Sequence, residues 1–319
     1  MIHGCEPEYQ TEQHDRTEGA RRPDKERGRQ MKNLAQVLDS LEQTMKAQQA
    51  KKKSALPPQK SAEIIQLPLW PEPTRGVPNC ALRGALFAAI QGKDRKALRR
   101  ELLTVQQGIE IRFTGWQLDQ ADMDVWEQAL HLVRQHPLGT RCDFSAHAFL
   151  KALGRNTGKS QHEQLKENFA RLGGCFVEIT HNQLTYGGSL LELYRDEHMN
   201  CYRLEINPKI KALYEAGFTQ IDWQQRQRLR RKPLAQWLHG FLASHAEPYP
   251  LKVATLMKLS GSQNKQLADF KRKLKAALGD LQSIGAVTYY EFNGALVTIY
   301  RTPSASQKRH LTKPRSRKK

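Results

Sequence analysis

Cationic side chains on one predicted helix are the residues of this chain best suited to a specific chemistry. Apolar residues recur at helical spacing over 264–284, and the opposite face carries Asn264, Lys265, Lys271, Arg272 and Lys275. Arg and Lys donate to guanine edges and phosphates, and Asn pairs with adenine edges. Such a face is suited to enter the major groove of DNA, whereas an ordinary solvated basic helix is the alternative.

Two acid-free basic runs accompany this helix. The segment 224–232 carries Arg226, Arg228, Arg230 and Arg231, and the segment 301–319 holds eight Lys or Arg residues. Such runs favour phosphate contact, which supplies affinity and salt dependence without sequence discrimination.

A third basic group lies nearer the middle of the chain. Lys159 and Lys166 fall on a predicted helix, where the acidic Glu163 and Glu167 stand between them and beside them. The mixed charge argues against base reading. It leaves backbone contact and a plainly solvated face equally favoured.

Catalytic and metal-binding patterns are weak in comparison. The segment 154–160 resembles a phosphate loop, but it has three residues between its glycines instead of four and follows a helix rather than a strand. The cysteines are scattered and odd in number: Cys5, Cys80, Cys142, Cys175 and Cys201. We therefore expect a protein that is not an enzyme and that needs no cofactor or metal.

The overall charge indicates a polyanionic partner. The 319 residues carry a formal net charge of +19, an imbalance that binding to nucleic acid relieves. A mean hydropathy of −0.69 indicates that part of the chain cannot form a core. No apolar run approaches the roughly 20 residues of a membrane span, and the first residues lack a signal peptide, so we expect a cytoplasmic protein with no membrane partner.

The N-terminal region, residues 1–62, is predicted to be disordered or partly helical. One apolar stripe repeats there at spacings of three and four: Met31, Leu34, Leu38, Leu41 and Met45. A coiled-coil-like helix that needs a partner and an isolated helix are equally favoured.

Residues 63–97 are predicted to be a proline-rich linker without regular structure. Within it, Gln66, Leu67, Leu69 and Trp70 form an apolar pentad with Pro68. The flanking prolines predict that these side chains are exposed and available to a partner. A strap packed on its own domain is the alternative.

Two folded domains are predicted to follow, one at 98–217 and one at 218–302, ahead of a basic tail at 303–319. In each, helices and a helix-turn-helix precede strands, and Asn293-Gly294 marks a hairpin turn in the second. This order predicts an α+β fold of tandem winged-helix domains.

Four stretches resemble the family of TrfA-type replication initiators of broad-host-range plasmids. They are the pentad 66–70, the core stretches 113–115 and 125–128, and the segment 244–252, Ser-His-Ala-Glu-Pro-Tyr-Pro-Leu-Lys. The resemblance covers roughly residues 62–301. It implies a bacterial, plasmid-encoded initiator that binds double-stranded origin repeats, called iterons, sequence-specifically.

The resemblance also implies partners. They are the host initiator, the replicative helicase and the sliding clamp, together with a homodimer in equilibrium with the monomer. Gln66, Leu67, Leu69 and Trp70 look like the clamp-binding pentad of bacterial replication proteins. A winged-helix transcriptional regulator of a plasmid operon is the rival class, and it would need no such pentad. A nicking relaxase would need a tyrosine beside a histidine cluster, and no such cluster is present.

Overall fold

The computed structural model describes residues 36, 39–47, 65–91, 95–106, 109–181, 184–196, 198, 201–215, 217–246, 249–303 and 307–308. The chain divides into two units, Met1–Glu63 and Ile64–Lys319. In the first unit, residues 39–47 are helical. Leu41 and Met45 of the predicted stripe are exposed there, whereas Met31, Leu34 and Leu38 lie outside the described residues.

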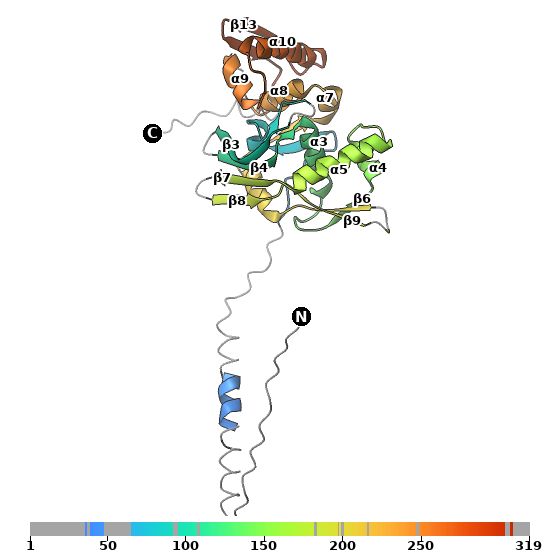
Figure 1. Cartoon of the computed structure of the whole chain (residues 1–319), viewed down its shortest axis with the longest axis vertical. Helices are drawn as coiled ribbons and strands as arrows, with labels where there is room; N and C mark the ends of the chain where they lie inside the picture. The colour runs from blue at the N-terminus through green and yellow to red at the C-terminus, as the bar shows by residue number, and fades with distance from the viewer. Residues whose placement is uncertain are drawn as a thin grey trace, which may run out of the picture. The chain divides into compact units, whose positions relative to one another are not determined.

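An antiparallel four-stranded sheet lies on one side of the second unit (Figure 1). Its strands are, in spatial order, β3 Ala97–Gln106, β4 Ile109–Trp116, β7 Phe176–His181 and β8 Leu184–Gly188. Alternation along β4 directs Ile111 and Phe113 into the core, where both are almost fully buried. Trp116 at the end of the same strand is 59% exposed.

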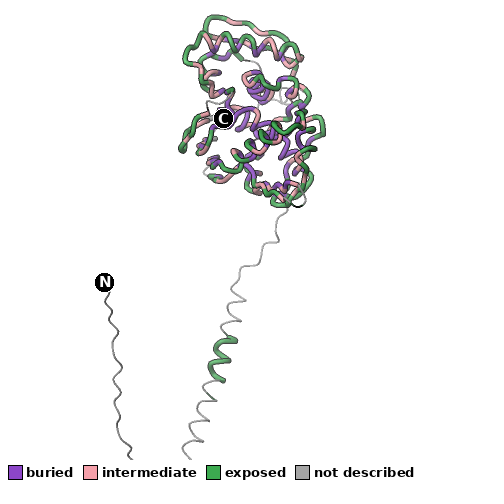
Figure 2. Tube along the Cα trace, turned by 45° about the vertical axis from the view of Figure 1, so that its right-hand side comes forward, coloured by how far each residue is buried: buried purple, intermediate pink, exposed green. Residues whose placement is uncertain are grey.

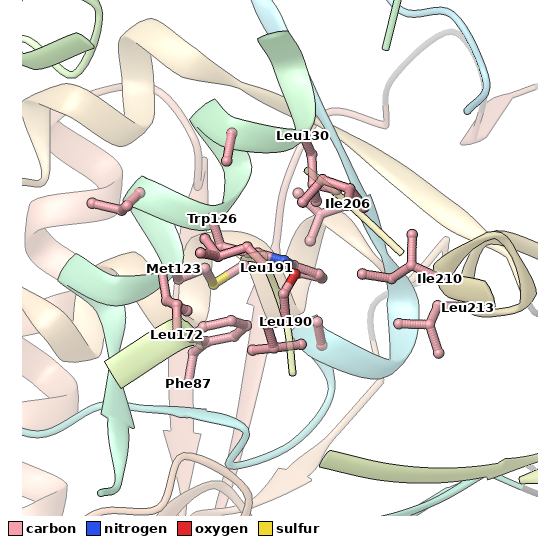
Figure 3. Close-up of a cluster of buried hydrophobic side chains, with 14 of the residues drawn as sticks. Phe87, Met123, Trp126, Leu130, Leu172, Leu190, Leu191, Ile206, Ile210 and Leu213 are labelled. Carbon is pink, nitrogen blue, oxygen red and sulfur yellow. Dashed lines mark hydrogen bonds between the residues drawn. The ribbon is translucent and has the colours of Figure 1, made fainter. Parts of the chain in front are cut away.

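Helix α3, Gln120–Val133, is the central helix of this part of the fold. Asp119 accepts hydrogen bonds from the backbone of Ala121 and Asp122, and the Asp122 carboxylate accepts one from the Asp119 backbone in return. This capping box fixes where the helix begins. Trp126 is fully buried and donates to the carbonyl of Leu190, so it lies at the centre of the cluster in Figure 3.

Two helices joined by a short turn and a second sheet complete this first module. Helix α4, Ala146–Ala152, begins at the Ser145 cap, and α5, Lys159–Gly173, follows after a short turn. A three-stranded sheet packs beside them in the order β6 Cys142–Phe144, β10 Cys201–Glu205 and β9 Glu192–Asp196. Rings of Phe144, Phe149, Phe169 and Tyr202 join the sheet to the helices.

The segment predicted to be an unstructured linker is part of this module. The elements within it are β1 Thr74–Pro78, α2 Asn79–Leu82 and β2 Phe87–Ala88. Strand β1 pairs with β11, Phe218–Asp222, and β2 pairs in parallel with β5, Leu118–Asp119. The short helices η1, Pro208–Ile210, and α6, Lys211–Glu215, precede β11. The prediction of an irregular linker is therefore wrong, because the prolines lie at the ends of elements or between them.

The second module begins with two helices, α7 Trp223–Arg228 and α8 Pro233–Ala243. Pro233 starts α8, since a proline fits the first helical turn and cannot continue a preceding helix. The remaining elements are β12 Leu251–Lys252, α9 Val253–Leu259, α10 Leu267–Ser283, β13 Tyr289–Asn293 and β14 Leu296–Tyr300. The hairpin predicted across Asn293-Gly294 is confirmed.

Two hydrophobic cores correspond to the two modules. The first runs in sequence from Leu67 to Trp223, and the second from Leu229 to Ile299. Buried segments run through both modules in Figure 2. Since β11 belongs to the first core, the change between cores falls after Trp223. The fold as a whole is of mixed α and β structure.

Candidate nucleic-acid interface

Helix α10 presents the most exposed cationic face of the second module. Its apolar stripe is almost entirely buried: Phe270, Leu274, Ala277, Leu278 and Leu281. Arg272, Lys273 and Lys275 are exposed on the rest of the helix surface, and Lys265 is exposed just before the helix begins at Leu267. The Arg272 side chain is 79% accessible and forms a long ion pair of 3.4 Å with Asp269, one turn away. It is therefore free to reach a ligand.

Two lysines predicted to face DNA also support the hairpin. Lys271 donates to the carbonyl of Gly294 at 2.8 Å. The ammonium groups of Lys271 and Lys275 lie 5.3 and 5.4 Å from the centre of the Phe292 ring, within cation–π range. Lys271 is half-buried, so Lys275 is the better placed of the two to hold a phosphate.

Asn264 lies in the turn before α10 rather than on the helix. It donates to the Ser262 hydroxyl at 2.6 Å and accepts from Lys273 at 2.7 Å. Lys273 is a further exposed cation of α10 that the sequence pattern does not single out, and it lies on the opposite flank of the helix from Lys275. Because Lys273 holds the Asn264 carbonyl oxygen, the Asn264 amide is oriented before any ligand binds.

In the first module, helix α5 carries the two predicted lysines on its outer side. Lys159 is exposed in the first turn. Lys166 is half-buried and pairs with Glu163 at 2.8 Å. Because this ion pair neutralises Lys166, α5 presents less free positive charge to solvent than α10.

The prediction that Arg226 contacts DNA is wrong, because its side chain is fully buried. Its Nε atom lies 2.7 Å from Asp124 Oδ1 and 2.9 Å from Glu127 Oε2 on α3. Burial lowers the pKa of Arg226, but the charges of Glu127 and Asp124 outweigh it and raise this pKa above its ordinary value. The guanidinium stays charged and holds the two modules together.

The other three arginines of the run are exposed. Arg228 ends α7, and Arg230 and Arg231 lie on the connection between α7 and α8. Arg230 donates to the carbonyl of Gly154 in the turn between α4 and α5. Arg231 has a positive φ of 66°, a conformation that non-glycine residues seldom adopt. The backbone of this cationic segment therefore has a defined conformation, which fixes the direction of its arginine side chains.

Two adjoining cavities lie along this connection. One, of about 340 Å³, is lined by residues that include Arg155, Asn156, Gln161, Gln164 and Arg230. The other, of about 390 Å³, includes Gln263, Asn264, Lys273, Ala276 and Asp280. Both are lined by Ile90, Gln91, Arg231 and Pro233. Amide and cationic groups from both helix-turn-helix units therefore border one concave surface.

The prediction of an exposed pentad is also wrong. Leu67 and Trp70 are 3% and 4% exposed, whereas Gln66 and Leu69, the latter at 68%, are exposed. The Trp70 ring stacks on Tyr214 at 6.1 Å, and the Gln66 amide donates to the carbonyl of Arg134 at 3.1 Å. The prolines do not prevent this packing, because the segment is not helical and its backbone hydrogen-bonds to the rest of the module. Residues 65–72 are named the strap below.

Polar groups at the end of α3 hold the strap. The Trp70 indole donates to Nδ1 of His131 at 3.0 Å, and Nε2 of His131 lies 2.9 Å from Glu72. Burial lowers the pKa of His131 to about 4, while the hydrogen bond to Glu72 opposes this and the positive charges of Arg75 and Arg134 add to it. His131 is therefore neutral at pH 7, with its proton on Nε2, because the indole can only donate.

Within the described residues, no group of three or more His, Cys, Asp or Glu side chains is arranged to hold a metal ion. The glycine-rich segment 154–160 forms the turn between α4 and the first residues of α5. No described helix is long and apolar enough to cross a bilayer.

Comparison with known proteins identifies relatives of this chain. A family model described as TrfA protein matches residues 28–301. The plasmid replication initiator protein TrfA of Escherichia coli is 26% identical over 245 residues, which cover 73% of this chain and 63% of that protein. The chain thus matches less than two thirds of the length of this curated relative.

Solved structures give more distant matches. Domains 2 and 3 of RctB, determined as selenomethionine derivatives, superpose with a TM-score of 0.48 at 13% identity, covering 70% of this chain and 98% of that one. A second structure of RctB domains 2–3 gives a TM-score of 0.44 at 13% identity, with coverage of 67% and 95%.

Proposed function

Since the chain belongs to the TrfA protein family, we propose that it initiates plasmid replication by binding repeated sequences in double-stranded origin DNA. The observation that carries this proposal is the family match together with the exposed cationic face of α10. The match covers 73% of this chain against a plasmid replication initiator. The cationic face supplies the chemistry that recognition of DNA requires.

We assign the two modules as tandem winged-helix domains. In the second, α9 and α10 form the helix-turn-helix, and the β13–β14 hairpin is the wing. In the first, α4 and α5 form the helix-turn-helix, and the β9–β10 hairpin is the corresponding wing. The chain order of helices and hairpin supports this assignment in both modules.

Three kinds of contact follow from the geometry. Arg272 reads base edges in the major groove, because it is exposed on the face of α10 that its apolar stripe leaves free. Lys265, Lys273 and Lys275 hold phosphates beside it. Lys159 on α5, with Arg228, Arg230 and Arg231 on the connection, contributes phosphate contacts that raise affinity for any sequence.

The partners are those that replication requires. We propose that origin-bound protein recruits the host initiator, the replicative helicase and the sliding clamp in the bacterial cytoplasm, and that a dimer exchanges with the active monomer. Clamp binding through Leu67 and Trp70 would require the strap to leave the body, since both side chains are buried. The protein carries out no catalysis of its own in this proposal.

Selection of binding sites from a random duplex library tests the proposal, followed by footprinting on DNA of the replicon that encodes the chain. The expected result is protection of several direct repeats that contain the selected sequence. A single protected palindrome in a promoter would favour the transcriptional regulator. Absence of any preferred sequence would refute the proposal.

A further inference from the structure

One short connector contacts the helix-turn-helix of the first module directly. It comprises α7 and residues 229–232. The Trp223 indole and the Gln227 amide both donate to the carbonyl of Ala152 at 3.1 Å, and Arg230 donates to that of Gly154. A Cβ on Gly154 would lie 3.1 Å from the Gln227 side chain. The turn between α4 and α5 is thus fixed to α7.

The helix-turn-helix of the second module is fixed to the same frame. Ala89 donates its backbone N–H to the carbonyl of Ser260 at 2.7 Å, in the turn that follows α9. A Cβ on Gly261 would lie 2.8 Å from that of Ala88, so the two backbones approach closely. At the other end of the connector, Lys232 pairs with Asp280 of α10 at 2.7 Å.

A buried polar joint anchors the connector between these contacts. The joint comprises Gln120, Asp124 and Glu127 of the α3 segment, Arg226 of α7 and Gln236 of α8. Besides its two carboxylate partners, Arg226 donates to Gln120 Oε1 at 3.1 Å, and Gln236 donates to Asp124 Oδ2 at 3.1 Å. All five side chains are buried, so water cannot simply replace one of the hydrogen-bonding partners while the joint rearranges.

We propose that the polar joint fixes the distance and rotation between α5 and α10, and thereby the number of base pairs that separate the two halves of the DNA site. Arg226 is the positioning residue of this joint and touches no DNA. The inference rests on the proposed function, because it requires both helices to contact one duplex.

The physical reason is the geometry of the double helix. One inserted base pair moves a half-site by 3.4 Å along the axis and turns it by about 35°. If α5 and α10 are held rigidly, they cannot adjust to both the translation and the rotation. Two helices joined by a flexible linker can adjust to both. Buried ion pairs add little net stability, but they can select one arrangement among several.

The first experiment uses the unmodified full chain, so folding cannot confuse it. Its probe is the duplex recovered by selection, together with versions that carry one to five base pairs inserted between the two protected halves. A single inserted pair is expected to weaken binding at least about tenfold, because either α10 or α5 then loses its contacts with bases. For α5 we infer that amide side chains on the concave surface, such as Gln161 and Gln164, make these contacts beside the phosphate contact of Lys159. Equal affinity for all spacings would overturn the inference and leave DNA recognition intact.

The second experiment compares Arg226→Met with Arg228→Met. Both changes remove one arginine from α7, but Arg228 is exposed and lies outside the joint. Arg228→Met should weaken all duplexes by the same factor and keep the full spacing penalty. Arg226→Met should reduce that penalty to less than about threefold, because each module then adjusts on its own.

Removing Arg226 leaves two buried carboxylates without a cation, so this variant is expected to be less stable. If it does not unfold cooperatively, Gln236→Met replaces it, since Arg226 then still neutralises Asp124 and Glu127. A folded joint variant that keeps the wild-type spacing penalty would overturn the role of the joint. Loss of sequence preference in the unmodified chain would refute the proposed function instead, so the two failures are distinguishable.

Discussion

Replacing Trp70 with alanine tests whether the strap belongs to the folded body. Trp70 is buried, stacks on Tyr214 and donates to His131. Substitution of a buried tryptophan by alanine usually costs about 3–5 kcal/mol of unfolding free energy, through lost contacts and a residual cavity. The orphaned acceptor of His131 adds to this cost, because His131 is itself buried.

The expected loss is therefore at least about 3 kcal/mol, or roughly 6–12 °C in the melting temperature of a body this size. Urea unfolding followed by circular dichroism measures it. Leu69→Ala is the matched control on the next residue, because its side chain is 68% exposed and should change stability by less than about 0.5 kcal/mol.

A third variant separates the hydrogen bond from the packing. Trp70→Phe keeps an aromatic ring over Tyr214 but has no N–H for His131, and it should cost less than the alanine change. The reasoning about the strap would be refuted if Trp70→Ala unfolded at the same urea concentration as Leu69→Ala. That result would mean that the pentad is exposed in solution and available to a partner.

Four further outcomes are expected. Gly76→Ala should destabilise the body by about 1–3 kcal/mol in urea unfolding, because the new Cβ would lie 2.4 Å from the Trp70 ring; no loss would show that the ring is not seated there. Acidification from pH 6.5 to 4 should destabilise the body in part through His131, whose folded pKa of about 4 lies below its unfolded value. The stabilising contribution of neutral His131 is complete above pH 6.5 and declines toward pH 4, so His131→Gln should flatten the pH dependence of urea unfolding, and an unchanged slope would contradict the assignment. Arg272→Ala should weaken the selected duplex by roughly 1–3 kcal/mol and random duplex far less, whereas Lys275→Ala should weaken both alike; equal losses for Arg272→Ala in competition binding would remove it from base reading. Deleting residues 309–319 should flatten the dependence of log affinity on log salt while site preference is kept, and an unchanged slope would exclude the tail from phosphate contact.

Local sequence patterns were sufficient to predict α10 and the hairpin of the second module. The apolar stripe of α10 and the Asn293-Gly294 turn are signals carried by neighbouring residues, and both elements formed where they were expected. The same stripe also predicts which side of α10 is exposed, and Arg272 and Lys275 are exposed there. Pro233 is the local signal for the break between α7 and α8, because a proline cannot continue a preceding helix.

The strap and Arg226 could not be predicted in this way. Trp70 is buried by Tyr214, a residue that follows it by more than 140 positions, and no local pattern reports such a contact. By composition, Arg226 is indistinguishable from Arg228. The one local hint is that α7 buries Trp223 and Arg226, three residues apart on one face, which marks the inward side of a short helix.

The pairing of β1 with β11 has a consequence for the order of folding. Their contacts join residues about 140 positions apart, such as Val77 and Thr219, so the first module is closed by its own last strand. During synthesis, β11 must emerge from the ribosome as far as Asp222 before this pairing can form. Until then the apolar side chains of β1 remain exposed to solvent. A fragment that stops at residue 217 would lack the closing strand and should aggregate, whereas one that extends through Arg228 should fold.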